Sequence, residues 1–171
     1  MQKGFTNGFL MRTIVGRCGY LWGQVGDFMF MGEYHHNIDT KKRIIIPFKF
    51  RSELGDNFVL TRGLDNCLFI YSQVEWQNII TKYKSLPNIK EARNFMRFFL
   101  SGAVECQLDK QGRIKIPHPL TKYASLEKEC IIIGVNDRLE IWSKDKWEQF
   151  IIENEDNLSE MADSLFASDL S

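Results

Sequence analysis

The sequence has few of the features that mark secreted and membrane proteins. It contains only four cysteines, Cys18, Cys67, Cys106 and Cys130, and no two of them have the C-x-x-C spacing, so nothing indicates a secreted disulfide framework. No apolar run approaches the roughly 20 residues that a membrane-spanning helix needs. We therefore expect a cytoplasmic protein with reduced thiols and no membrane partner.

Signatures of catalysis are missing as well. The sequence has no G-x-S-x-G, P-loop or dinucleotide-binding fingerprint. Two of the three histidines, His35 and His36, are neighbours on a predicted strand, so they point to opposite faces and do not share one metal ion without distortion. The third, His118, lies beside prolines. The sequence therefore predicts a protein that is not an enzyme, with no cofactor, no metal site and no small-molecule substrate.

The formal net charge is zero, but the charges are unevenly distributed along the chain. Residues 39–51 hold five Lys/Arg and one acid, and residues 109–122 hold four Lys/Arg and one acid. Residues 145–171 hold eight acids and one Lys. Two basic segments and an acidic C-terminal segment are thus hidden in a neutral total.

Each basic segment begins with a copy of one repeated motif. Residues 38–47 read I-D-T-K-K-R-I-I-I-P, and residues 108–117, 70 positions later, read L-D-K-Q-G-R-I-K-I-P. Each copy predicts a strand, a tight turn opened by the side chain of Asp39 or Asp109, and a second strand that ends at proline. Gly112 suits a turn position with positive φ. Lys42 stands at the equivalent position, where positive φ would cost about 1 kcal/mol, so the sequence leaves the type of the first turn open.

The repeat extends well beyond the turns. The predicted strands of the first copy cover residues 32–38, 43–46, 58–61 and 67–71, and the predicted helices cover 47–54, a segment after Ser72, and 89–101. Each repeat is a ββαββα unit, which is too small to bury a large core alone. We therefore predict a β-rich α+β fold in which two units wrap into one pseudo-twofold β-structure.

The domain boundaries follow from this pattern. Residues 1–28 hold six glycines without sustained periodicity, which favours a disordered or non-native N-terminal extension with no role in the fold. We assign residues 32–76 to the first repeat, 77–101 to a connecting helical region, 102–147 to the second repeat, and 148–171 to an acidic C-terminal helix or tail.

Both turns are candidates for a nucleic-acid interface. Lys41, Lys42 and Arg43 crowd the first hairpin tip, and Lys110, Arg113 and Lys115 flank the second. A β-ribbon fits the major groove of DNA, where arginine can bridge O6 and N7 of guanine. The alternative is a solvated charged turn in which each Asp and Arg form a purely structural pair. The residues alone leave both interpretations open.

The motifs G-x-Y-x-x-x-I-D-x-K-x-R-I-x-I-P-x-x-F-R at 32–51, R-G-L-D at 62–65 and D-x-x-G-R-I-x-I-P at 109–117 resemble the MraZ family. The resemblance covers Met29 to about Asn157, and it departs at Lys42, where the family usually has glycine. It implies two AbrB/SpoVT-like swapped-hairpin repeats that form a pseudo-twofold β-barrel with peripheral helices.

The resemblance also implies a function. Members of the family are bacterial transcriptional regulators that assemble into rings and bind short direct repeats in double-stranded DNA upstream of the division and cell-wall gene cluster. Asp39, Arg43, Asp109 and Arg113 would lie on the DNA-facing surface, with Lys41 as a neighbouring contact, and the protein would associate with the nucleoid. The alternatives are an antitoxin-like AbrB-fold protein whose acidic tail occupies a toxin, and an oligomeric scaffold that binds no DNA.

Overall fold

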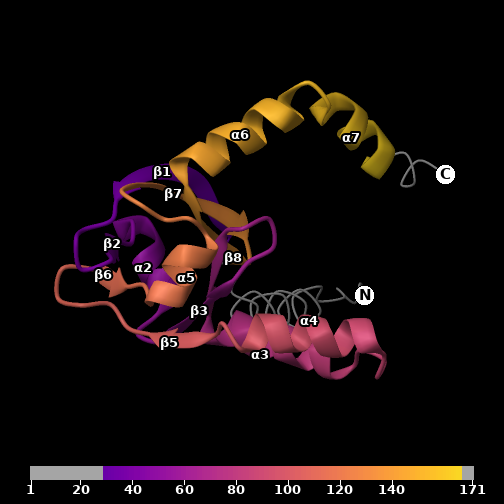
Figure 1. The fold of residues 1–171 in the computed structure, drawn as a ribbon, viewed down its shortest axis with the longest axis horizontal. Helices are drawn as coiled ribbons and strands as arrows, with labels where there is room; N and C mark the ends of the chain where they lie inside the picture. The colour runs from indigo at the N-terminus through magenta and orange to yellow at the C-terminus, as the bar shows by residue number, and fades with distance from the viewer. Residues whose placement is uncertain (1–28, 167–171) are drawn as a thin grey trace, which may run out of the picture.

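The computed structural model describes residues 29–166 (Figure 1). The predicted extension at 1–28 and the last five residues lie outside this range. The strands are β1 Phe30–Asn37, β2 Arg43–Ile45, β3 Phe58–Arg62, β4 Leu68–Ser72, β5 Val104–Cys106, β6 Arg113–Lys115, β7 Glu129–Asn136 and β8 Arg138–Ser143. The helices are α2 Phe48–Leu54, α3 Gln73–Lys84, α4 Lys90–Leu100, α5 His118–Tyr123, α6 Lys144–Glu155 and α7 Leu158–Phe166. Within residues 29–166, none of the helices has the length and apolar character that a membrane crossing requires.

Local signals account for the ends of these elements. Gly55 follows α2 with φ 73°, and its N–H donates to the Arg51 carbonyl at 3.2 Å, as is common for a glycine that ends a helix. The Ser72 hydroxyl accepts from the Glu75 N–H at 3.3 Å at the start of α3, which makes Ser72 the N-cap of this helix. The predicted strands and helices of the first repeat are therefore all present, with small shifts at their ends.

The two repeats exchange their opening strands. The larger sheet has the order β1-β7-β8-β4-β3-β5, and every pair in it is antiparallel. The first strand of repeat one, β1, pairs with β7 of repeat two, whereas the first strand of repeat two, β5, pairs with β3 of repeat one. The strands β4 and β8 meet at the centre. Neither repeat can complete its sheet without the other, which explains why so small a unit is duplicated.

The pseudo-twofold β-barrel that the resemblance implies is not found among residues 29–166. In the described part of the chain, β1 and β5 are the two edges of the larger sheet, and β2 and β6 form a separate two-stranded sheet. This small sheet, which we call the ribbon, covers the larger sheet through buried side chains such as Ile44 and Ile114. Side-chain packing replaces the backbone pairing that would close a barrel. The fold is therefore an α+β arrangement of two antiparallel sheets.

The larger sheet is buried on both faces. On one face, Leu68 and Ile70 of β4 join a core with the ribbon, α2 and α5. On the other face, Phe69 and Tyr71 of the same strand join an aromatic core that includes Phe99 of α4. The alternation of side chains along β4 thus supplies both cores. The ribbon lies on one side of the molecule, and α3 and α4 cover the other (Figure 1).

Candidate nucleic-acid interface

The two repeated motifs fold into the same turn. In the first turn, the Asp39 N–H donates to the Arg43 carbonyl and the Lys42 N–H donates to the Asp39 carbonyl, both at 2.9 Å. The corresponding bonds of the second turn, with Gly112 in place of Lys42, measure 2.9 and 2.8 Å. Lys42 has φ 59° and Gly112 has φ 74°. The lysine therefore adopts the left-handed conformation, and the first turn keeps the geometry of the second.

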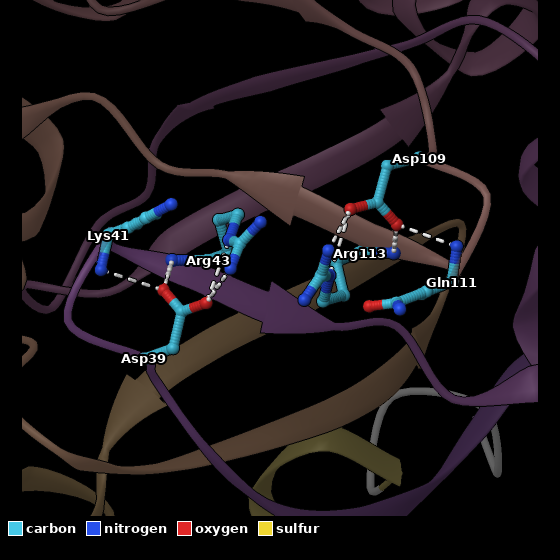
Figure 2. A network of polar contacts seen from close by, with 6 residues as sticks. All are labelled: Asp39, Lys41, Arg43, Asp109, Gln111 and Arg113. Atoms are coloured by element: carbon cyan, nitrogen blue, oxygen red, sulfur yellow. Dashed lines mark hydrogen bonds and ion pairs between the residues drawn. The ribbon is translucent and has the colours of Figure 1, made fainter.

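In each turn, one aspartate organises both the backbone and the arginine (Figure 2). Asp39 Oδ1 accepts the N–H groups of Lys41 and Arg43, both at 2.9 Å. Its Oδ2 accepts Arg43 Nε at 2.7 Å and Nη2 at 2.6 Å. Asp109 repeats the set, with Oδ1 2.8 Å from Gln111 N and 3.0 Å from Arg113 N, and with Oδ2 2.8 Å from both Nε and Nη2 of Arg113. The predicted structural pairing of Asp with Arg is therefore present in both turns.

These contacts fix the charge state of the two carboxylates. The side-chain hydrogen bond from Arg43 is the largest cause that lowers the pKa of Asp39, and backbone N–H groups add to it. The equivalent bond from Arg113 lowers the pKa of Asp109 to about 2. Both carboxylates are consequently ionised at neutral pH, and each ion pair is intact there.

The ribbon joins the two tips into one surface. Arg43 lies opposite Lys115, Ile44 opposite Ile114, and Ile45 opposite Arg113. Beyond this ladder, the Ile46 N–H donates to the Gly112 carbonyl and the Ile116 N–H donates to the Lys42 carbonyl, both at 2.9 Å. Each turn is thus bonded to the strand that leaves the other turn. The two Asp–Arg pairs lie side by side on the ribbon (Figure 2).

The basic side chains of the predicted site are accessible to a ligand. Lys41 and Lys110 are exposed, and Lys42 is half-buried. The side chains of Arg43 and Arg113 are 29% and 22% exposed, although each is held by an aspartate. The structure therefore brings these five basic residues to the ends of one ribbon.

Sequence reasoning missed the role of Arg51. Its Nε donates to the Ile46 carbonyl at 2.9 Å, and its guanidinium fills the space that a Cβ atom at Gly112 would need. The residue at the equivalent place in the second repeat is the much shorter Thr121, whose hydroxyl donates to the His118 carbonyl at 2.9 Å. This difference explains why the second turn has glycine while the first accommodates Lys42. No sequence signal marks Arg51, because neighbouring equivalent positions such as Phe48 and His118 differ as well.

No other candidate functional site in residues 29–166 is as well defined as the two tips of the ribbon. An open hollow of about 620 Å³ borders α2 and includes Phe48, Arg51 and Asp56. Residues 29–166 contain no cluster of three His, Cys, Asp or Glu side chains that could hold one metal ion. The paired tips are therefore the strongest candidate for a functional surface.

Comparisons with known proteins agree with this duplicated architecture. Residues 29–98 and 99–169 each match the family described as "MraZ protein, putative antitoxin-like". The narrower repeat boundaries given above, 32–76 and 102–147, stay a prediction.

Two curated relatives cover most of the chain. A protein of Ligilactobacillus salivarius (strain UCC118) named Transcriptional regulator MraZ is 54% identical over 143 residues, which are 83% of this chain and 100% of the relative. A protein of the same name from Thermoanaerobacter pseudethanolicus (strain ATCC 33223 / 39E) is 58% identical over 138 residues, which are 80% of this chain and 96% of the relative. These relatives are transcriptional regulators rather than enzymes. With both repeats matched and more than half of the aligned residues identical, the chain belongs to the MraZ family of transcriptional regulators.

Proposed function

We propose that this protein regulates transcription by placing its ribbon in the major groove of specific DNA sites. The observation that carries the proposal is the pair of aspartate-held arginines, Arg43 and Arg113, side by side on one exposed two-stranded surface (Figure 2). A two-stranded ribbon has the dimensions of a major-groove reader. The names of the two relatives support a role in transcription.

The ion pairs are compatible with base recognition. Each aspartate occupies the edge of the guanidinium formed by Nε and one hydrogen of Nη2. The other edge, with Nη1 and the second hydrogen of Nη2, can donate two hydrogen bonds to O6 and N7 of guanine. Because the aspartate already fixes the arginine rotamer, less conformational entropy is lost on binding. Asp39 and Asp109 therefore act as positioning residues for Arg43 and Arg113.

The lysines supply the contacts that do not depend on sequence. Lys41, Lys42 and Lys110 surround the two arginines at the turns. Lysine ammonium groups pair with phosphate oxygens, which fixes the orientation of the protein on the duplex and makes affinity fall with salt. In this proposal the arginines recognise bases, and the lysines contact the phosphate backbone.

The direct test replaces Arg43 or Arg113 by alanine and measures binding to DNA from upstream of the protein's own gene. We expect the loss of one bidentate contact to weaken specific binding by about 5- to 150-fold, because such a pair is worth about 1–3 kcal/mol. Lys128→Ala removes an exposed basic side chain just before β7, outside the ribbon and outside α3 and α4, so it is the control and should bind normally. Normal binding by both ribbon variants would refute the proposal.

Features of the helices support self-assembly into a ring. The C-terminal arm, residues 144–166 with α6 and α7, holds seven acids and two lysines, whereas residues 73–100 with α3 and α4 hold five Lys/Arg and two acids. Both segments expose large apolar side chains, among them Ile152, Leu158, Val74 and Ile89. Two unlike, complementary surfaces on one chain are what a head-to-tail ring requires. We propose that the arm of one subunit packs on α3 and α4 of the next.

A ring would present several ribbons to the same DNA, so we propose that the target is a set of direct repeats. As in the family that the sequence resembles, these repeats would lie upstream of the division and cell-wall gene cluster. The protein would then be located at the nucleoid. The description "antitoxin-like" keeps a second candidate open, in which the acidic arm covers a toxin. A small protein that co-purifies on the arm in place of a second subunit would favour that candidate.

A further inference from the structure

The exposed face of the ribbon is asymmetric although the two turns are alike. Along each strand, the middle residue is buried: Ile44 is 0% and Ile114 is 1% exposed. The residues on either side of it therefore face outward, which gives Arg43 and Ile45 on β2 and Arg113 and Lys115 on β6. Because the strands are antiparallel, Arg43 is opposite Lys115, and Ile45 is opposite Arg113.

On the outward face of the two strands, the asymmetry lies at one pair of equivalent positions, although the turn residues 40–42 and 110–112 also differ in sequence. Residues 45 and 115 are 70 positions apart, the repeat distance, yet one is isoleucine and the other lysine. Both are exposed. The turns, the aspartates and the arginines on either side match almost bond for bond. One end of the ribbon thus combines arginine with lysine, and the other combines arginine with a branched aliphatic side chain.

The fold does not require the isoleucine. The Ile45 side chain belongs to neither hydrophobic core and is 43% exposed. It borders an open hollow of about 460 Å³ whose rim includes His36 and Lys144. A single exposed isoleucine is ordinary on most surfaces. This one lies directly across the ribbon from Arg113, within about 5 Å by the geometry of antiparallel neighbours, on the face proposed to enter the groove.

We propose that Ile45 and Lys115 are specificity-determining residues that make the two tips read unlike base pairs. The inference rests on the proposed function. In the major groove, the thymine 5-methyl is the apolar group available to an aliphatic side chain, and O6 and N7 of guanine are the acceptors available to lysine. Ile45 packs on the methyl of a thymine next to the guanine taken by Arg113. Lys115 donates to a guanine next to the one taken by Arg43.

This asymmetry gives each subunit a direction on the duplex. Two identical tips related by a twofold axis would bind a palindrome equally well in either orientation. With isoleucine at one end and lysine at the other, one orientation satisfies both side chains, and the reversed orientation sets Ile45 against a guanine and Lys115 against a methyl. An element with direction suits repeats that all run the same way.

The test uses the full-length protein and a promoter fragment from upstream of its own gene. One thymine position at a time is changed to deoxyuridine in every repeat, which removes only the 5-methyl. We expect one position at which binding weakens by at least about fourfold, the change that corresponds to the transfer of one methyl-sized group from water. Ile45→Ala should bind the thymine and uracil probes equally. Leu64→Ala, which shortens an exposed aliphatic side chain between β3 and β4, should keep the wild-type difference.

Two outcomes would overturn the inference: equal binding of every uracil probe by the wild type, or an unchanged uracil effect in Ile45→Ala. Ile45→Lys with Lys115→Ile provides a second measurement, because the exchanged protein should prefer the probe whose repeat sequence is reversed. Failure of the proposed function is distinguishable. In that case Arg43→Ala and Arg113→Ala would also leave binding unchanged. Because both positions are exposed, unfolding of the variants should match the wild type.

Discussion

Asp39 and Asp109 each close a turn and hold an arginine with the same carboxylate. Three hydrogen bonds and one ion-pair contact converge on the two oxygens of each one. The structural and the functional interpretation of the motif are therefore compatible, because the bonds that shape the turn also orient the guanidinium toward a ligand. In the proposed complex, each aspartate also places a negative charge near the DNA backbone, which opposes binding.

Replacing both aspartates distinguishes their effect on the orientation of the arginines from their effect on the net charge of the ribbon. The double variant Asp39→Asn, Asp109→Asn makes the ribbon more positive, so electrostatics alone predicts tighter binding to any DNA. We expect specific affinity to fall at least about tenfold, because a neutral amide holds the guanidinium weakly, while affinity for a scrambled probe holds or rises. Fluorescence anisotropy with both probes at one salt concentration measures the ratio. Asp56→Asn removes the same charge from an exposed site after α2 and should leave the ratio unchanged; a double variant with undiminished specificity would contradict the positioning role.

Gly112 and Arg51 form a second pair of coupled positions. Gly112→Ala should destabilise the protein by about 1–2 kcal/mol, because alanine is unfavourable at φ 74° and its Cβ would collide with the Arg51 guanidinium. In an Arg51→Thr background, which copies the second repeat, the collision disappears and the loss should shrink. Urea unfolding of the wild type, the two single variants and the double variant gives the coupling energy between Gly112 and Arg51. Equal losses in both backgrounds would show that the backbone conformation alone requires glycine.

At the scale of single residues, the sequence predicts those features that depend only on adjacent residues in the chain. The aspartate turns and the positive φ of Gly112 follow from local motifs, and both are present. The role of Arg51 depends on how one repeat packs against the other, which no local pattern contains. The turn at Lys42 was undecided because its strain of about 1 kcal/mol is smaller than the stabilisation that surrounding bonds supply.

At the level of elements, strand exchange explains both the success and the failure of the fold prediction. The alternation of apolar and polar residues, which has a period of two along a strand, locates β1 to β4, and turn residues mark their ends. Which strand pairs with which is set by tertiary packing, so the edges at β1 and β5, and hence the open sheet, were not predictable. A short β5 of three residues pairs only with β3 in the described chain.

The helices on the face opposite the ribbon depend on Phe99. Its ring is 2% exposed and lies 5.5 Å from Trp76 and 5.3 Å from Tyr83 between ring centroids. Phe99→Ala should lower the free energy of unfolding by about 3–5 kcal/mol. Phe98→Ala, at a neighbouring position 40% exposed, is the control and should cost less. DNA affinity at low temperature should change little, because the ribbon lies across the sheet from this cluster; a large loss of affinity with normal stability would show that α4 contributes to the interface.

For the whole molecule, the proposed head-to-tail contact between the arm and α3–α4 can be tested by charge reversal. Glu153→Lys with Asp156→Lys should dissociate the assembly, because both changes place positive charge against a positive surface. Arg93→Glu with Arg97→Glu should dissociate it as well, and the four changes together should restore it. Light scattering after size-exclusion chromatography measures the mass. A combined variant that stays monomeric, or single sets that stay assembled, would contradict the pairing of these surfaces.

The spacing of the DNA repeats decides whether several subunits of one assembly can bind the same DNA at once. One ribbon offers few base contacts, so one subunit should bind one repeat weakly. Repeats about one helical turn apart, roughly 10–10.5 bp, present the same groove to successive subunits. After the first ribbon binds, the others bind at high effective concentration, which can add a factor of about 10²–10⁴ in affinity.

We therefore expect tight binding to need both an oligomer and repeats in phase. Three probes test this: one repeat, several repeats in phase, and several repeats separated by an additional half turn of about 5 bp. The wild type should bind the in-phase probe most tightly and lose most of that advantage on the other two. The charge-reversed monomer should bind all three alike, because it has no second ribbon to engage. Affinity of the wild type that is equal for all three probes at one salt concentration would identify a single-site reader and rule out avidity as the source of its affinity.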